Sequence, residues 1–140
     1  MKYKFLSHTA DIKVHAEGRT IEKAFINSVL ALGEVIREKI IIKSIVKKKI
    51  VVEGKDFPSL LYNFLEEILF LLDAENFLFS KVKNLKIIKI ANKLKLEANI
   101  LGDGANTYKF SNDVKAITYN DMIIKENKNK KWIIEFVLDV

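Results

Sequence analysis

Apolar and polar residues alternate along several stretches of the chain, which is the pattern of a β-strand with one buried face. In residues 11–17, Ile12, Val14 and Ala16 alternate with polar residues, and residues 94–100 repeat the pattern. Further strands are predicted at residues 2–6, 40–53 (as one long strand or two short ones), 77–90, 113–125 and 131–138. The pattern therefore predicts roughly six to eight strands.

Two segments show helical spacing instead. In the first, Thr20 can cap a helix whose apolar residues recur every three or four positions to about Lys39. In the second, Asp56 is the expected cap, and Pro58 falls in the first turn, where its missing N–H does no harm. Apolar residues then form a wide stripe through residues 60–72, so this helix should be deeply packed.

This order of elements predicts an α+β fold class. We expect a single domain over residues 1–140, with a largely antiparallel sheet or sheets and two main helices packed on one face. Strands outnumber helices, and several follow one another directly, as in hairpins. The chain has one proline and five glycines, and its sequence shows neither a linker-like segment nor an internal repeat.

The composition narrows the chemistry. The 140 residues include no cysteine, which excludes disulfides, thiolate zinc sites, iron–sulfur clusters and cysteine nucleophiles. The longest apolar run, Ile68–Leu72, is far shorter than the ~18 residues of a membrane-spanning helix. The N-terminal residues lack the apolar region of a signal peptide. We therefore expect a cytoplasmic protein with no membrane association.

Positive charge is in excess. Basic residues outnumber acidic ones by 24 to 18, which gives a net charge of +6, and only Arg19 and Arg37 are not lysines. A composition rich in lysine, glutamate and isoleucine is typical of hyperthermophile proteins, and an AT-rich genome produces the same bias. The excess would also suit long-range attraction of an anion or a nucleic acid. Both explanations stay open at this point.

Motifs of several enzyme classes are missing from the sequence. It contains no Walker phosphate loop, no dinucleotide-binding glycine fingerprint and no Gly-x-Ser-x-Gly nucleophile motif. His8 and His15 are the only histidines, and they do not form a zincin motif. We therefore expect that the chain is not itself an enzyme.

Three positions could nevertheless carry chemistry. Asp11 opens the alternating strand, Asp139 ends the last strand, and Lys115 shares a predicted strand with Thr118 after a polar loop. Each position also has a plain structural interpretation. Asp11 would be a turn or cap residue, Asp139 part of a solvated chain end, and Lys115 an ordinary half-exposed strand residue.

The chain resembles the archease family over essentially its whole length. The matching segments are His8–Ile12, the helix at residues 60–69, the sequence Lys115–Tyr119 and the ending Leu138–Val140. Each segment is short, but their shared order and spacing make the resemblance specific.

Archeases assist the RtcB-type RNA ligase, which joins tRNA halves after intron removal. The resemblance implies that this chain promotes guanylylation and multiple turnover of such a ligase, and that it meets tRNA or other RNA through the ligase. It also implies a divalent metal held by Asp11 and Asp139, with the terminal carboxylate of Val140 nearby. Lys115 matches a family lysine that is thought to matter for activation.

The implied metal site is physically reasonable. Two carboxylates placed close together repel unless a cation or a proton neutralises one of them. Ligation by oxygen atoms alone suits a hard cation, so we expect Ca²⁺ first, with Mg²⁺ or Mn²⁺ as alternatives, and water in the remaining positions. Only the fold could unite Asp11 and Asp139, because they lie near opposite ends of the sequence.

The sequence also departs from the family pattern. Lys13 stands where the family usually has glycine, and Gly102–Asp103 stands where it has Gly-Glu. Phe110 and Asn120 replace histidines that are common in the family. The resemblance therefore supports no histidine role at these two positions, whereas both aspartates and Lys115 are intact.

Two other functions remain as alternatives. One is an RNA-binding module that uses a lysine-rich sheet surface and has no role with a ligase; aromatic residues exposed among the lysines would favour it. The other is a metal-dependent hydrolase, which is less well supported because the sequence offers two aspartates and no convincing general base.

Overall fold

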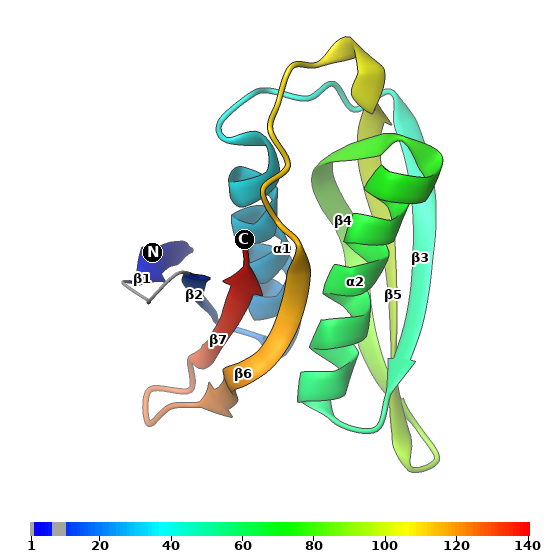
Figure 1. Cartoon of the computed structure of the whole chain (residues 1–140). Coiled ribbons are helices and arrows are strands. Elements are labelled where there is room, and N and C mark those ends of the chain that lie inside the picture. Colours follow the sequence, from blue (N-terminus) through cyan, green and yellow to red (C-terminus); the bar gives the residue numbers. More distant parts are fainter. Residues whose placement is uncertain (1, 7–10) are drawn as a thin grey trace.

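The computed structural model describes residues 2–6 and 11–140. His8, Thr9 and Ala10 of the family-like segment His8–Ile12 therefore lie outside the described residues. The elements in chain order are β1 (Tyr3–Leu6), β2 (Asp11–Gly18), α1 (Ile21–Arg37), β3 (Val46–Gly54), α2 (Phe57–Glu75), β4 (Phe77–Ile90), β5 (Lys93–Gly104), a short 3₁₀ turn (Ala105–Thr107), β6 (Ala116–Glu126) and β7 (Trp132–Asp139), as Figure 1 shows.

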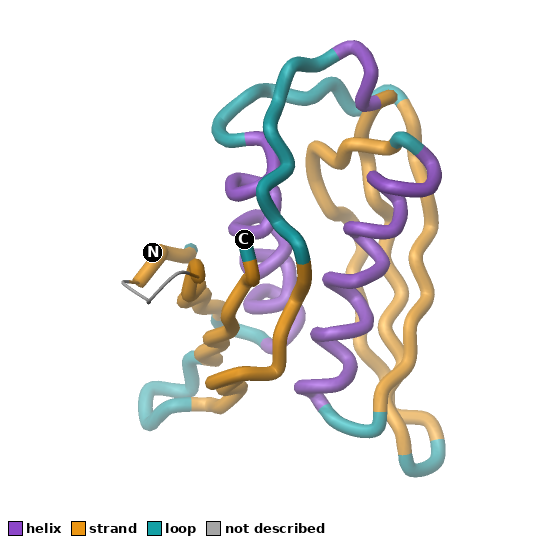
Figure 2. The backbone as a smooth tube through the Cα atoms, viewed as in Figure 1, coloured by secondary structure: helices purple, strands orange, loops and turns teal. Residues whose placement is uncertain are grey.

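The strands of the described residues form two antiparallel sheets. Sheet A has the strand order β1-β2-β7-β6, and sheet B has the order β3-β5-β4. Both ends of the chain supply sheet A, whereas its middle supplies sheet B and α2. Long loops over residues 38–45 and 108–115 cross between the two halves (Figure 2). Sheet A is therefore completed only when the C-terminal strands return beside β2.

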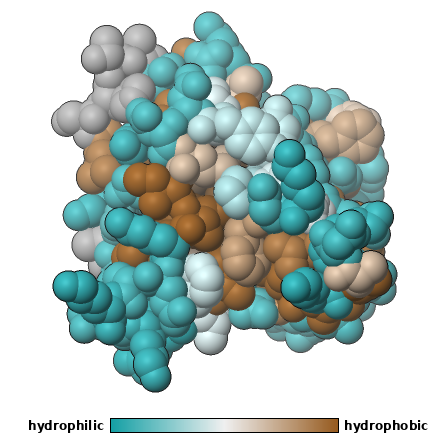
Figure 3. Space-filling model, turned by 90° about the horizontal axis from the view of Figure 1, so that it is seen from below, coloured by the Kyte–Doolittle hydropathy of each residue, from teal (hydrophilic) through white to brown (hydrophobic). Residues whose placement is uncertain are grey.

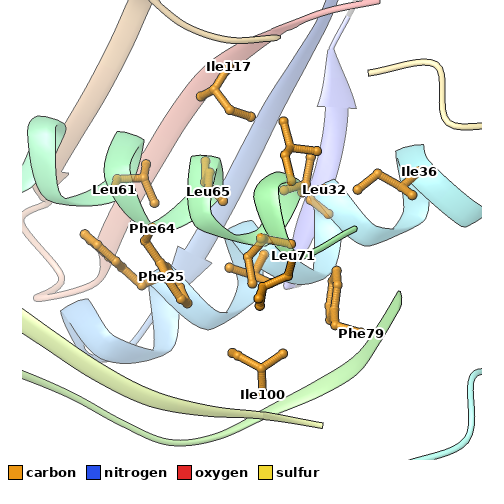
Figure 4. Close-up of a cluster of buried hydrophobic side chains, with 14 of the residues drawn as sticks. Phe25, Leu32, Ile36, Leu61, Phe64, Leu65, Leu71, Phe79, Ile100 and Ile117 are labelled. Carbon is orange, nitrogen blue, oxygen red and sulfur yellow. The ribbon is translucent and has the colours of Figure 1, made fainter. Parts of the chain in front are cut away.

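The two helices form a layer between the sheets. In Figure 4, Ile117 of β6 lies on one side of the helices and Ile100 of β5 on the other. The largest side chains that are fully buried come from both helices and both sheets: Phe25, Leu32, Ile36, Leu60, Leu61, Phe64, Leu65, Leu78, Leu96, Ile100, Ile134 and Phe136. Burial stabilises by about 1.5–3 kcal/mol for each large apolar side chain, so this layer is the main source of stability.

The predicted fold class is confirmed. The described chain is α+β, its strand pairs are antiparallel, and its helices cover one face of each sheet. Strand ends were predicted less well. Residues 40–45 and 113–115 are not strands, because β3 starts opposite Gly102 and β6 starts opposite Asp139, close to the ends of their partner strands. β5 extends only two residues beyond Gly102, and β7 ends at Asp139, so the pairing stops there.

Helix α2 begins with a reciprocal cap. The Asp56 side chain accepts a hydrogen bond of 2.9 Å from the Ser59 backbone N–H, and the Ser59 hydroxyl accepts one from the Asp56 N–H. Pro58 lies in the first turn, as the sequence predicts. The hydrogen bond from Ser59 lowers the pKa of Asp56 below its ordinary value of 3.8. The charged carboxylate therefore contributes to helix stability.

Apolar side chains reach the surface at the lower end of the molecule. Figure 3 shows them in the middle of this end, with hydrophilic side chains around them. Phe57, the first residue of α2, and Trp132, the first of β7, meet in an edge-to-face contact with ring centroids 5.6 Å apart. No helix formed by the described residues combines the length and apolar character that a membrane crossing requires.

A close backbone approach at Gly102 joins β5 to β4. A Cβ atom at Gly102 would lie 2.2 Å from the Leu78 carbonyl oxygen, whereas one at Gly104 would meet no atom within 4 Å. Gly102→Ala should therefore push the strands apart and lower the free energy of unfolding by about 1–3 kcal/mol. Gly104→Ala, the matched control, should change it by less than about 0.5 kcal/mol. Urea denaturation of both variants measures the difference; equal stabilities would contradict the close approach.

Loss of the α2 cap should depend on pH. Asp56→Ala should cost about 1 kcal/mol at pH 7. Because the folded-state pKa of Asp56 is lowered, the contribution of the charge is present above pH 3.8 and is lost as the pH falls through the folded pKa. The difference between wild type and Asp56→Ala should therefore shrink in acid, while Asp56→Asn should keep most of the cap. Denaturation curves between pH 2.5 and pH 7 test this, and a difference independent of pH would count against it.

Candidate functional site

The structure brings Asp11 and Asp139 together. β2 and β7 pair antiparallel from Asp11↔Asp139 to Gly18↔Trp132, so the two aspartates are directly opposite each other. Residues opposite each other in an antiparallel pair point to the same face, with Cβ atoms about 4.5–5.5 Å apart. Ile12 and Leu138 beside them turn toward the core, which leaves both aspartates on the outer face of sheet A. Both side chains are half-buried.

Lys115 lies beside this pair, in the coil immediately before β6. Its backbone N–H donates a hydrogen bond of 2.7 Å to the Asp139 carbonyl, immediately before Ala116 pairs with Asp139. The Lys115 side chain is exposed. The first residues of β2 and β6 and the last of β7 thus lie side by side at one end of sheet A, and the candidate residues from three sequence segments share that end.

A cavity of about 410 Å³ opens at this end of sheet A. Its lining residues are Phe5, Leu6, Asp11, Ile12, Glu34, Val35, Asp113 and Val140. Val140 follows Asp139 and also packs against the core. Glu34 accepts a hydrogen bond of 2.8 Å from the Tyr3 hydroxyl. Burial, followed by this hydrogen bond, raises the pKa of Tyr3 to about 12.

Asp113 and Glu34 were not among the site residues that the sequence indicated. Asp113 lies in the coil before β6, where the sequence predicted strand, and Glu34 lies on α1. Their acidic character is visible in the sequence, but only the packing of α1 against β1 and β2 brings Glu34 to the cavity that Asp11 also lines. For Asp113, the only sequence signal was its position two residues before Lys115 in the predicted strand.

A chain of charges continues along the outer face of sheet A. His15 lies between Glu17 and Glu135, with each carboxylate oxygen 2.7 Å from a ring nitrogen. Lys13 lies 3.8 Å from Glu135. The hydrogen bond with His15 lowers the pKa of Glu17, with a smaller contribution from Lys131. Pairing therefore keeps this carboxylate ionised.

The donor set suits a hard cation only in part. Within residues 2–6 and 11–140, no three or more His, Cys, Asp or Glu side chains are grouped closely enough to hold a metal. Asp11 and Asp139 supply two carboxylates, so water and the carboxylate of Val140 would have to complete the six to eight oxygens that Ca²⁺ takes. Mg²⁺, which retains several waters, places a smaller demand on the protein.

The two positions that lack the family histidines have different surroundings. Phe110 is partly buried and packs against the core. Asn120 is exposed, and its backbone N–H donates a hydrogen bond of 3.2 Å to the Thr118 hydroxyl. The Phe110 side chain offers no metal ligand, and Asn120 lies within the irregular part of β6 between Thr118 and Ile123.

The chain is similar to known proteins over nearly its whole length. The model of the archease protein family matches residues 3–140. Protein archease of Thermococcus kodakarensis is 38% identical over 141 residues, and the alignment covers 99% of both chains. Protein archease of Methanosarcina mazei is 29% identical over 141 residues, and the alignment covers 99% of this chain and 96% of the relative. The solution structure of Methanobacterium thermoautotrophicum protein 1598 superposes with a TM-score of 0.85 at 30% identity, covering 99% of this chain and 98% of the other. The chain belongs to the archease family.

Proposed function

We propose that this protein activates an RtcB-type RNA ligase in tRNA splicing, promoting guanylylation and multiple turnover of the ligase through a divalent-metal site. Membership of the archease family supports the assignment. The observation that carries it furthest is the register pairing of Asp11 with Asp139, which places two family-like aspartates opposite each other, with Lys115 beside them in the coil before β6.

In this proposal the protein is an accessory factor and performs no catalysis of its own. Asp11 and Asp139 hold the cation, with Val140 at its side, and the exposed Lys115 contacts the ligase or its nucleotide phosphates. A lysine suits that role because its ammonium group is a compact, flexible point charge. A bound divalent cation would neutralise the paired carboxylates, whose mutual repulsion otherwise disfavours their close approach.

The position of Asp11 and Asp139 also supports action on a partner. Asp11 and Asp139 lie on the outer face of sheet A, and Lys115 is exposed beside them. The core consists of the helical layer between the sheets and does not require the aspartates. A partner could therefore reach this end of sheet A without disturbing the packing that keeps the domain folded.

Substitution of either aspartate should abolish activation while leaving the fold intact. Loss of even an outer-sphere partner typically costs 10–100-fold in metal affinity, so Asp11→Asn or Asp139→Asn should weaken Ca²⁺ binding by at least about tenfold. Both variants should fail to stimulate multiple-turnover ligation by the cognate ligase. Asp73→Asn, on the exposed part of α2, is the matched control. Calcium titration calorimetry and a ligation assay measure the two effects.

Thermal melting separates a functional metal from a structural one. The apolar core is large enough for a domain of this length, so wild type and both aspartate variants should melt cooperatively in EDTA. Loss of cooperative melting on chelation would mean that metal binding supplies folding free energy, and the site would then be structural. Unimpaired activation by folded aspartate variants would refute the proposed function.

Lys115→Ala should reduce activation without changing stability. The side chain is exposed, and its backbone hydrogen bond to Asp139 survives the substitution. Such surface changes usually alter stability by less than about 0.5 kcal/mol. Lys109→Ala, an exposed lysine of the preceding loop, controls for the loss of one charge. Guanylylation of the ligase is the readout, and full stimulation by folded Lys115→Ala would exclude a role for this side chain.

A further inference from the structure

Sheet B carries the whole net charge of the protein. Its three strands hold nine of the 24 basic residues but only three of the 18 acidic ones, so the rest of the chain holds 15 of each sign. The four strands of sheet A, in contrast, hold three lysines and six acidic residues. Charge of opposite sign is thus separated onto two sheets that lie on either side of the helical layer (Figure 1).

Strand register gathers four of the lysines of sheet B around one point. The rows across the sheet are Lys49–Asn99–Lys83 and Lys47–Leu101–Lys81. Ala98 and Ile100 on β5 are buried against the helices, so the alternating Asn99 and Leu101 face outward. We call Lys47, Lys49, Lys81 and Lys83 the lysine tetrad. All four side chains are exposed.

Acidic groups neutralise little of the tetrad. Of its four members, only Lys49 has a carboxylate within 4.0 Å among the described residues, and that is Glu97 at 3.6 Å. Lys86 shares the same carboxylate at 3.3 Å, which lowers the pKa of Glu97. One carboxylate is thus shared by two lysines. The charges of the other three tetrad members, Lys47, Lys81 and Lys83, face the solvent.

The spacing of the tetrad suits a polymer of closely spaced negative charges. Side chains two residues apart on one strand are about 6.8 Å apart, and strands that flank a common neighbour are about 10 Å apart. A nucleic acid duplex presents one charge per roughly 1.7 Å of its axis. Four flexible lysines on this rigid grid can therefore contact several phosphates simultaneously.

The surroundings of the tetrad favour phosphates over bases or an acidic protein. The outward-facing strand residues of sheet B include no aromatic side chain, so bases would find nothing to stack on. Lysine is depleted in the cores of protein–protein interfaces, where aromatic residues and arginine are enriched. The outward cations here are all lysines, and the centre of the tetrad offers Asn99 and the half-buried Leu101.

From these observations we infer that the outer face of sheet B binds the phosphodiester backbone of double-stranded RNA through the lysine tetrad, independently of base sequence. The choice of RNA over DNA rests on the proposed ligase role, whereas the backbone contact rests on the charge distribution alone. The metal-binding end of sheet A is left free, so the protein could contact RNA and a ligase simultaneously.

Salt dependence of RNA binding by the isolated protein tests this inference without any ligase. The probe is a fluorescein-labelled 20-base-pair RNA duplex, and fluorescence anisotropy gives the dissociation constant from 50 to 200 mM salt. The logarithm of affinity falls with the logarithm of salt by about 0.9 per phosphate contact. Changing all four tetrad lysines to glutamine should therefore reduce the slope by about three to four, and affinity at 50 mM salt should fall at least tenfold.

The matched control changes four exposed lysines outside sheet B to glutamine: Lys39, Lys109, Lys125 and Lys128. It removes the same charge and should keep nearly the wild-type slope. Asn99→Lys, which adds a cation at the centre of the tetrad, should steepen the slope by about one, and a misfolded protein could not produce that gain. Circular dichroism melting checks the fold of all variants.

Three outcomes would overturn the inference. They are equal losses of RNA affinity in the tetrad and control variants, no binding of the duplex by wild type at 50 mM salt, and binding of anionic phosphatidylserine vesicles in preference to RNA.

The same measurement with a DNA duplex separates the two parts of the claim. Equal affinity for DNA would refute the choice of RNA, and with it the support drawn from the ligase role, while the tetrad would stand as a phosphodiester site. Loss of ligase activation by Asp11→Asn with unchanged RNA binding would separate the two functions.

Discussion

β2 and β7 pair along their whole length, and this ladder holds the two ends of the chain together. The pairing does three things at once. It completes sheet A, it turns Ala16 and Phe136 into the core, and it places Asp11 opposite Asp139. A shift of one residue in this register would turn the apolar side chains outward and the aspartates inward. The core and the candidate metal site therefore depend on the same register, so selection for stable packing also preserves the geometry of the site.

The helical layer stabilises the register of β2 and β7. Helix α1 packs against β2 and β4, and α2 packs against β3 and β6, so each helix buries side chains against both sheets. Gly33 of α1 allows the Phe79 ring to approach closely, since a Cβ atom there would lie 2.6 Å from the ring. Arg37 then covers the same ring at 5.4 Å from its centroid and donates a hydrogen bond to the Phe79 carbonyl. Movement of one sheet would thus disturb packing shared with the other.

With the helices inside, both sheets present their outer faces to solvent, and these faces differ in charge. Sheet A ends in the pair Asp11 and Asp139, with Lys115 beside it, and carries an excess of acidic residues, whereas sheet B carries the lysine tetrad. A protein with both charges on one surface would neutralise itself through internal pairs, as Glu97 partly does with Lys49 and Lys86. Separation by the helical layer keeps the two fields apart, so each face can attract a different partner.

Local patterns in the sequence determined the elements. The alternation at residues 11–17, the caps Thr20 and Asp56 and the apolar stripe of the second helix predicted β2, α1 and α2, because each depends on neighbours a few positions away. The family resemblance identified Asp11, Asp139 and Lys115. Only the tertiary structure decided that the aspartates are register partners and that strand pairing stops before residues 40–45 and 113–115. It also decided that lysines of β3 and β4 share one face. Those outcomes depend on pairing between segments distant in the sequence, and no local pattern records which strands become neighbours.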